Sequence, residues 1–99
     1  MNLYEFIAQD TERETIIYED ESIRIVTINS SHHTTRIDAP YVQEEDEWVS
    51  ILEGEAELKV ENTIIPLHKG DHYMIKAHQK HWVTYTSNRC IWLCVFEKI

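Results

Sequence analysis

The stretch from Gln43 to Val49, QEEDEWV, places four acidic side chains directly before an apolar run. In an extended strand Glu47 points the same way as Val49 and Ile51, because side chains alternate between the two faces. If that face is buried, the Glu47 carboxylate needs a partner or a metal ion, since an isolated buried charge is costly. The three acidic residues before Glu47 are then a solvated rim. Glu47 is therefore the first candidate for acid–base chemistry or metal binding.

Two polar side chains upstream point to the same strand face as Glu47 if the strand begins early enough to include them. Gln43 precedes it by four residues, and Tyr41 by six. An amide oxygen is a weak ligand for hard cations, and it can equally orient a substrate or a metal-bound water. Tyr41 could donate a hydrogen bond or serve as an acid at the rim of a pocket. These two residues extend the candidate site.

The elements that position these side chains are short strands joined by polar turns. Ala56, Leu58 and Val60 alternate with charged residues, which is the period-two pattern of a half-buried antiparallel strand. At least seven short strands of this kind are typical of an all-β sandwich or barrel. We expect strands at residues 13–19, 22–29, 47–52, 56–60, 63–67, 73–77, 82–86 and 91–96. The best helix candidate covers residues 3–8.

The glycines and cysteines of the chain are few and informative. Gly54 and Gly70 are the only glycines and fall at turns, where a backbone conformation that disfavours a Cβ is expected. Cys90 and Cys94 are the only cysteines. On one strand they lie about 13 Å apart at about 3.3 Å per residue, which is too far for a disulfide. We expect buried, reduced thiols.

Length and charge limit the class of protein. The 99 residues make one small domain, for which formation of a homodimer would bury further apolar area. A net charge of −9 repels phosphate backbones and anionic lipid, so we expect neither nucleic-acid nor membrane partners. No apolar run reaches the roughly 18 residues of a membrane span. The N-terminus lacks the basic start and apolar stretch of a signal peptide, so a cytoplasmic location is expected.

Residues 47–81 resemble the two conserved motifs of the cupin family. Glu47 is followed by six residues and Gly54, as in the first motif, and Gly70 precedes His81 by eleven positions, as in the second. The resemblance implies a small antiparallel jelly-roll barrel. It implies a single cupin domain over residues 1–99, with an N-terminal extension at 1–12 and the barrel at 13–98.

The resemblance also implies a reduced set of metal ligands. Cupins usually supply two histidines and a glutamate from the first motif and a histidine from the second. Here the two histidine positions fall on Tyr41 and Gln43, or on Pro40 and Val42 with the alternative spacing. The ligand set implied is Glu47, His81 and Gln43 with water, and Mn, Fe, Ni or Zn would each suit it. In the alternative, His81 is a barrel-wall residue hydrogen-bonded to Glu47.

Other histidines are weaker candidates. His78 precedes His81 by three residues, so the two face opposite ways unless a turn intervenes as it does in the family. With Glu47 and Tyr41, His78 completes the set of candidate catalytic residues, and an exposed turn histidine is the alternative. His32 and His33 are expected in a loop that could close over the pocket.

The resemblance implies a broad class of function and does not choose one reaction. Cupins act as isomerases, hydrolases, decarboxylases and dioxygenases, so a small-molecule enzyme with a Glu/His pocket is implied, with or without a weakly held metal. One alternative is a cupin that binds or senses a small ligand without catalysis. Another is a structural homodimer module that uses Trp and Tyr side chains on its outer sheet.

Overall fold

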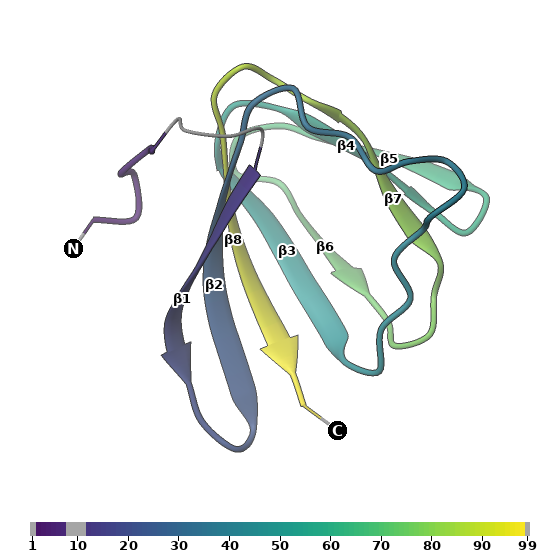
Figure 1. Cartoon of the computed structure of the whole chain (residues 1–99), viewed down its shortest axis with the longest axis horizontal. Helices are drawn as coiled ribbons and strands as arrows, with labels where there is room; N and C mark the ends of the chain where they lie inside the picture. Colours follow the sequence, from purple (N-terminus) through teal and green to yellow (C-terminus); the bar gives the residue numbers. More distant parts are fainter. Residues whose placement is uncertain (1, 8–11, 99) are drawn as a thin grey trace.

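The computed structural model describes residues 2–7 and 12–98, which form eight antiparallel strands. The strands are β1 (Glu12–Glu19), β2 (Ile23–Ser30), β3 (Asp46–Glu53), β4 (Ala56–Val60), β5 (Thr63–Leu67), β6 (His72–Ile75), β7 (His81–Thr86) and β8 (Cys90–Glu97). They make a five-stranded sheet in the order β1-β2-β8-β3-β6 and a three-stranded sheet in the order β5-β4-β7. The two sheets face each other as two layers (Figure 1). The predicted all-β jelly-roll barrel is confirmed.

The segment between β2 and β3 runs beside β7 and extends the smaller sheet (Figure 1). The Thr35 N–H donates to the Val83 carbonyl at 2.8 Å. Tyr41 and His81 exchange two backbone hydrogen bonds, of 2.9 and 3.0 Å. We call residues 31–45 the crossing segment. Because it is tied to the free edge of β7, it can hold side chains over the interior between the two sheets.

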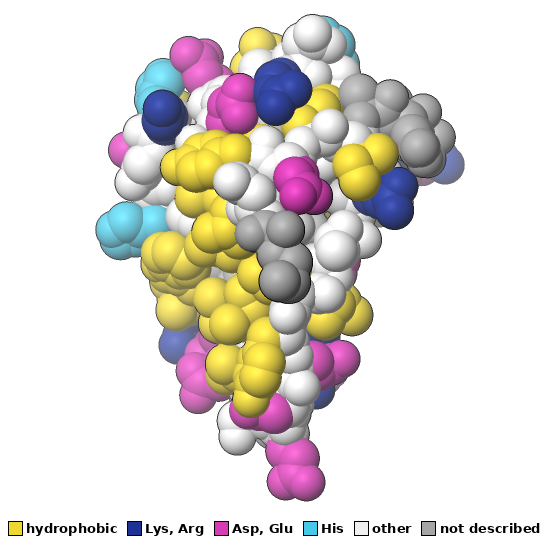
Figure 2. All heavy atoms as spheres, turned by 90° about the vertical axis from the view of Figure 1, so that its left-hand side faces the viewer, with side chains coloured by type: hydrophobic (Ala, Val, Ile, Leu, Met, Phe, Trp, Pro, Cys, Tyr) yellow, Lys and Arg dark blue, Asp and Glu magenta, His cyan; other side chains and the backbone are white. Residues whose placement is uncertain are grey.

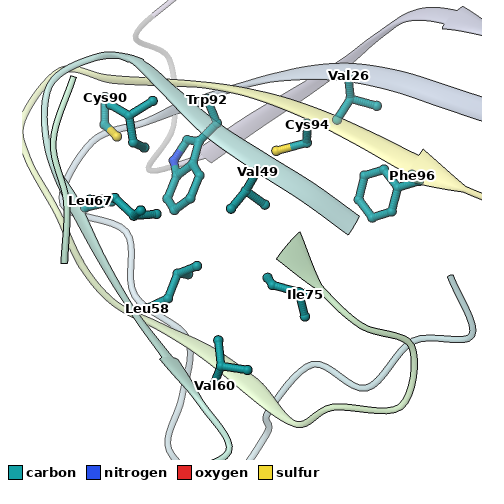
Figure 3. Packing of buried hydrophobic residues seen from close by; sticks show 12 residues of the cluster. Val26, Val49, Leu58, Val60, Leu67, Ile75, Cys90, Trp92, Cys94 and Phe96 are labelled. Carbon is teal, nitrogen blue, oxygen red and sulfur yellow. The ribbon is translucent and has the colours of Figure 1, made fainter. Parts of the chain in front are cut away.

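The core lies between the sheets and is built from side chains of β2, β3, β4, β5, β6 and β8, at alternate positions along β3, β4 and β8 (Figure 3). Glu47, Val49 and Ile51 all point inward, as the sequence pattern predicted. On β8 the inward side chains are Cys90, Trp92, Cys94 and Phe96. Removing each large apolar side chain from water contributes about 1.5–3 kcal/mol, so this cluster supplies most of the driving force for closing the barrel. Both cysteines are buried and free, as expected.

The two glycines adopt left-handed backbone conformations, with φ of +82° at Gly54 and +89° at Gly70. Gly54 follows the last residue of β3 and packs closely against the Arg89 backbone, whereas no neighbouring atom lies within 4 Å of the place where a Cβ on Gly70 would stand. The sequence-based expectation for both turns is confirmed, since only glycine adopts this conformation without steric cost.

The N-terminal residues differ from expectation. The helix predicted at residues 3–8 is wrong over residues 3–7, where the chain makes a turn at Leu3–Tyr4, while Ala8 lies outside the described residues. The run is too short to offset the cost of helix nucleation without a packing partner. None of the described residues belongs to a helix that could cross a membrane.

The side of the molecule on which β1 lies carries exposed apolar side chains. Ile16, Ile17 and Tyr18 on β1 are each about half exposed. Figure 2, which looks onto this side, shows apolar side chains gathered in one band with acidic side chains near its lower end. β1 is an edge strand with a bulge between Ile16 and Tyr18. Such a bulge disrupts the regular hydrogen-bond ladder of an edge.

Candidate functional site

Glu47 lies near the start of β3 and points into the interior between the sheets. Its backbone is flanked by Phe96 of β8 and Ile75 of β6, and only 7% of the residue is exposed. Burial raises the pKa of the Glu47 carboxyl to about 7, although hydrogen bonds from the Gln43 amide and the Cys94 thiol favour the charged form. Near neutral pH this carboxyl therefore exists in both the protonated and the charged form, as a general acid or base requires.

His81 is the first residue of β7 and is 4% exposed. Its Nδ1 lies 3.2 Å from the Gln79 carbonyl oxygen. A carbonyl only accepts, so Nδ1 carries the proton and Nε2 presents its lone pair. That Nε2 lies 3.8 Å from Glu47 Oε1, beyond hydrogen-bonding distance. Burial lowers the pKa of His81, so the ring is neutral near pH 7.

Gln43 and Tyr41 reach the same interior from the crossing segment. The Gln43 side-chain amide donates to Glu47 Oε1 at 3.0 Å, which orients the carboxyl. The Tyr41 ring is tilted against the His81 ring with centroids 5.4 Å apart. Burial first, and then the charge of Glu12, raise the pKa of the Tyr41 hydroxyl, so that it stays protonated. The structure thus brings together four predicted site residues: Tyr41, Gln43, Glu47 and His81.

His78 is not brought to this pocket. It lies in the turn before β7 with a φ of +71°, and its side chain is 66% exposed. Its Nε2 is 3.7 Å from Glu44 Oε2, and its backbone N–H donates to the Gln43 carbonyl at 2.8 Å. The turn therefore directs the ring to solvent, which was the alternative considered from the sequence. Through its backbone His78 helps to hold Gln43 in place.

The sequence did not single out the acidic residues of β1 that line the same pocket. Glu12 and Glu14 pair with Ser30 and Ile28 of β2 and share the inner face of the sheet. The domain boundary drawn from the sequence put Glu12 in the N-terminal extension, whereas β1 begins at Glu12. Glu12 Oε2 lies 3.3 Å from His33 Nε2. The alternation in ERETIIYE was the only available signal, and it did not reveal which other strand would face these residues.

The pocket has a volume of about 120 Å³, and its exposed lining residues, Glu14 of β1 and Tyr41 of the crossing segment, mark its mouth. Most binding sites for drug-sized ligands are larger, at roughly 300–1,000 Å³, so only a small molecule fits inside. Apolar side chains of β2, β3, β4, β6, β7 and β8 form its walls. Three glutamates, Glu12, Glu14 and Glu47, line it, and no Lys or Arg does within the part of the chain that the structure describes.

The residues present do not make a complete metal site. Glu47 and His81 supply one carboxylate oxygen and one imidazole nitrogen, and the third predicted ligand, Gln43, directs its NH₂ group at Glu47. Within residues 2–7 and 12–98 no three His, Cys, Asp or Glu side chains converge so that they could hold a metal ion. Catalytic metal sites ordinarily have at least three protein donors, and Glu47 and His81 supply two. The residues present therefore do not fit a catalytic metal ion.

Comparison with known proteins gives the family. The cupin domain family matches residues 31–96, which span β3 to β7 and all of β8 except its last residue. The chain belongs to the cupin family. Among curated proteins no sequence matches this cupin.

Solved structures of other proteins share its fold. A candidate mannose-6-phosphate isomerase from Ralstonia eutropha is 25% identical, with a TM-score of 0.90 over 100% of this chain and 97% of that one. A Streptococcus pyogenes protein of unknown function is 19% identical, with a TM-score of 0.83 over 100% and 86%. KdgF from Halomonas sp. is 14% identical, with a TM-score of 0.75 over 94% and 84%.

Proposed function

We propose that this cupin is an isomerase-type enzyme that moves a proton between carbons of a small carbonyl compound. The observation that carries the proposal is the pair of buried groups at the pocket floor, with Glu47 Oε1 3.8 Å from His81 Nε2. Their protonation states are complementary near neutral pH. The neutral His81 ring is a base with an open lone pair, and the partly protonated Glu47 carboxyl is an acid.

The proton steps balance without any further reagent. His81 Nε2 takes a proton from the carbon next to the carbonyl group, and the electron pair of that C–H bond forms a carbon–carbon double bond. The carbonyl oxygen takes the proton of Glu47, which gives an enediol when the substrate is an α-hydroxycarbonyl compound. The Glu47 carboxylate then takes a proton from the other enediol hydroxyl, and His81 returns its proton to the former carbonyl carbon. Both residues end in their starting states.

The protein around the pair supports this chemistry. Gln43 holds Glu47 Oε1, and the Gln79 carbonyl fixes the tautomer of His81. The largely apolar walls lower the local dielectric constant, which strengthens each polar interaction inside. Similarity to the candidate sugar-phosphate isomerase favours the same class of reaction. It does not extend to a phosphate group, because the described pocket lining offers three carboxylates and no Lys or Arg.

The test is proton exchange, which does not require the natural substrate. Hydroxyacetone, dihydroxyacetone and glyceraldehyde are each incubated with the full chain in D₂O, and loss of the α-proton NMR signal is followed. We expect the protein to accelerate exchange with at least one probe. Glu47→Gln and His81→Asn should each lower that rate by about a hundredfold or more. His81→Asn retains a donor for the Gln79 carbonyl and removes only the reactive nitrogen.

His78→Asn is the matched control, because His78 is a histidine outside the pocket and asparagine tolerates its positive φ. Its exchange rate should equal that of the unmodified chain. If no probe exchanges faster than in buffer, or if Glu47→Gln exchanges as fast as the unmodified protein, the proposal is wrong. Binding of a probe without exchange would instead favour the non-catalytic ligand-binding cupin.

A further inference from the structure

The mouth of the pocket carries two carboxylates from one edge strand. Glu12 and Glu14 lie two residues apart on β1 and both line the opening. The pairing of Glu14 with Ile28, itself a pocket residue, fixes this orientation. Glu12 has His33 beside it at 3.3 Å. Glu14 makes no hydrogen bond or ion pair among residues 2–7 and 12–98, and its charge acts only at longer range on Arg24, which is already paired with Glu45. The Glu14 carboxylate is therefore available for a direct contact with a ligand.

The floor of the pocket presents acceptors as well. The His81 side chain is only 5% exposed, and its Nε2 has no partner nearer than Glu47 Oε1 at 3.8 Å. The one amide donor at the floor, Gln43, is engaged by Glu47. A ligand that enters this pocket therefore meets an acceptor in His81 Nε2, beside a Glu47 carboxyl that donates when protonated and accepts when charged. Carboxylates line both the mouth and the floor, and within the described residues no Lys or Arg lines either.

The electrostatics of the pocket favour a positive charge. Burial raises the pKa of both Glu12 and Glu47, and the charge of Glu14 raises each further. Carboxylates that repel one another in a low-dielectric pocket are stabilised by a cation and destabilised by an anion. Aromatic rings of Tyr41, Trp92 and Phe96 also line the pocket, and ring faces attract organic cations.

We propose that the pocket takes a small organic cation, whose protonated amino group is bound at the mouth by Glu14 and Glu12. The inference rests on the proposed function, because it names the substrate class for the same site. The ammonium group supplies the donors that the mouth lacks, and the rest of the molecule reaches Glu47 and His81. The pocket volume of about 120 Å³ limits that remainder to a few carbon atoms.

Three matched probes test this charge preference: n-butylammonium, 1-butanol and butyrate, which share a four-carbon chain and differ in charge. Each is titrated into the ¹⁵N-labelled full chain at constant ionic strength. The Trp92 indole N–H resonance, assigned with Trp92→Phe, reports entry into the pocket. We expect n-butylammonium to give a saturating shift at lower concentration than 1-butanol, and butyrate to give none.

Two single-charge variants separate a local contact from the overall charge. Glu14→Gln should weaken n-butylammonium binding by about fivefold, the effect of one ion pair near the surface. Glu21→Gln removes the same charge from the β1–β2 turn, outside the pocket, and should leave binding unchanged. Equal binding of the three probes, or equal effects of the two variants, overturns the inference. So does a Trp92 shift with Zn²⁺ but not with n-butylammonium, since the cation would then be a metal ion.

The isomerase activity and the cation site can each be refuted while the other stands. Butyl probes carry no carbonyl group, so their binding tests charge selection without any proton-transfer chemistry. A chain that binds n-butylammonium selectively and exchanges no carbonyl probe would retain the cation site and lose the isomerase assignment. A chain that exchanges a carbonyl probe and binds the three butyl probes equally would retain the enzyme and lose the cation site.

Discussion

Glu47 and His81 face each other at the floor of the pocket, with 3.8 Å between Oε1 and Nε2 and both side chains buried. They come from β3 and β7, which belong to different sheets. The distance is too long for a hydrogen bond, so neighbouring atoms of one ligand can contact both groups. The pair depends on the closure of the barrel, which makes it sensitive to changes that alter the packing of the two sheets.

Replacement of Glu47 by Gln should change how stability depends on pH. Raising the pKa of this carboxyl from 4.5 to about 7 corresponds to about 3 kcal/mol. The folded state favours the protonated form, so this contribution is fully present below pH 4.5 and is lost as the pH rises through 7. Glutamine stays neutral throughout. Between pH 4.5 and 8, the free energy of unfolding of the unmodified chain should fall by about 3 kcal/mol relative to Glu47→Gln.

Urea unfolding at several pH values, followed by Trp fluorescence, measures this difference. The charged or polar groups that act on Glu47 are Gln43, Cys94, Glu14, Arg24 and His81. All of them remain in the variant, so subtracting the two curves isolates Glu47. Parallel curves for the two proteins would show that Glu47 titrates normally and is not buried in the folded state.

The rate of proton exchange should have a bell-shaped pH dependence. His81 must be neutral and Glu47 protonated for the first proton transfer. Because burial lowers the pKa of His81 from 6.5 and raises that of Glu47 to about 7, both conditions hold only between these two pKa values, below about pH 7. kcat/KM for the best carbonyl probe, measured from pH 4.5 to 9, should decline on both sides of that range. A rate that keeps rising above pH 8 would contradict the assignment of Glu47 as the acid.

Alanine at the two glycines should have unequal costs. At Gly54 an added Cβ overlaps the Arg89 carbonyl oxygen, which is backbone and cannot move aside cheaply, so Gly54→Ala should lower the free energy of unfolding by about 3 kcal/mol or more. Gly70→Ala meets no neighbouring atom within 4 Å and should cost only the positive φ, about 1 kcal/mol. Urea unfolding of both variants checks this. Equal losses in the free energy of unfolding would mean that the positive φ, and not the contact with Arg89, sets the cost of alanine at both positions.

Metal content should be low. The incomplete donor set predicts that protein purified without a histidine tag holds well under one equivalent of Mn, Fe, Ni or Zn by mass spectrometry. Treatment with EDTA should then leave the melting temperature and the probe exchange rate unchanged. If the protein holds one equivalent of any of these metals, and EDTA removes both the metal and the activity, this prediction is wrong. The metal ligands implied by the sequence resemblance would then be correct.

The homodimer expected from the small size of the chain stays a prediction. Trp48 and Met74 occupy the outer face of the larger sheet, where Trp48 is half-buried against His72 and Met74 is exposed. If this face forms the contact, sedimentation velocity should give a two-chain mass, and Met74→Glu should give a one-chain mass with an unchanged far-ultraviolet circular dichroism spectrum. A one-chain mass for the unmodified protein at high concentration would refute the prediction.

Much of the site could be read from alternation within single strands. The parity of Glu47 with Val49 and Ile51 placed its side chain inside, which is a local feature, because a strand fixes the faces of its own residues. His81 was found through the resemblance to the second cupin motif, in which a histidine follows the glycine by eleven positions. The exposure of His78 could not be decided the same way, because it depends on a turn with a positive φ.

The sequence by itself determined the strands, their buried faces, the two glycine turns and the carboxyl that must be buried. Only the tertiary structure decided which buried faces meet. Glu12 and Glu14 lie on an edge strand with mostly exposed residues, and nothing local distinguishes them from solvated glutamates. They join the pocket because β1 pairs with β2 while the crossing segment follows β7. Pairing between distant segments is set by closure of the whole barrel, so a pattern within one segment cannot reveal it.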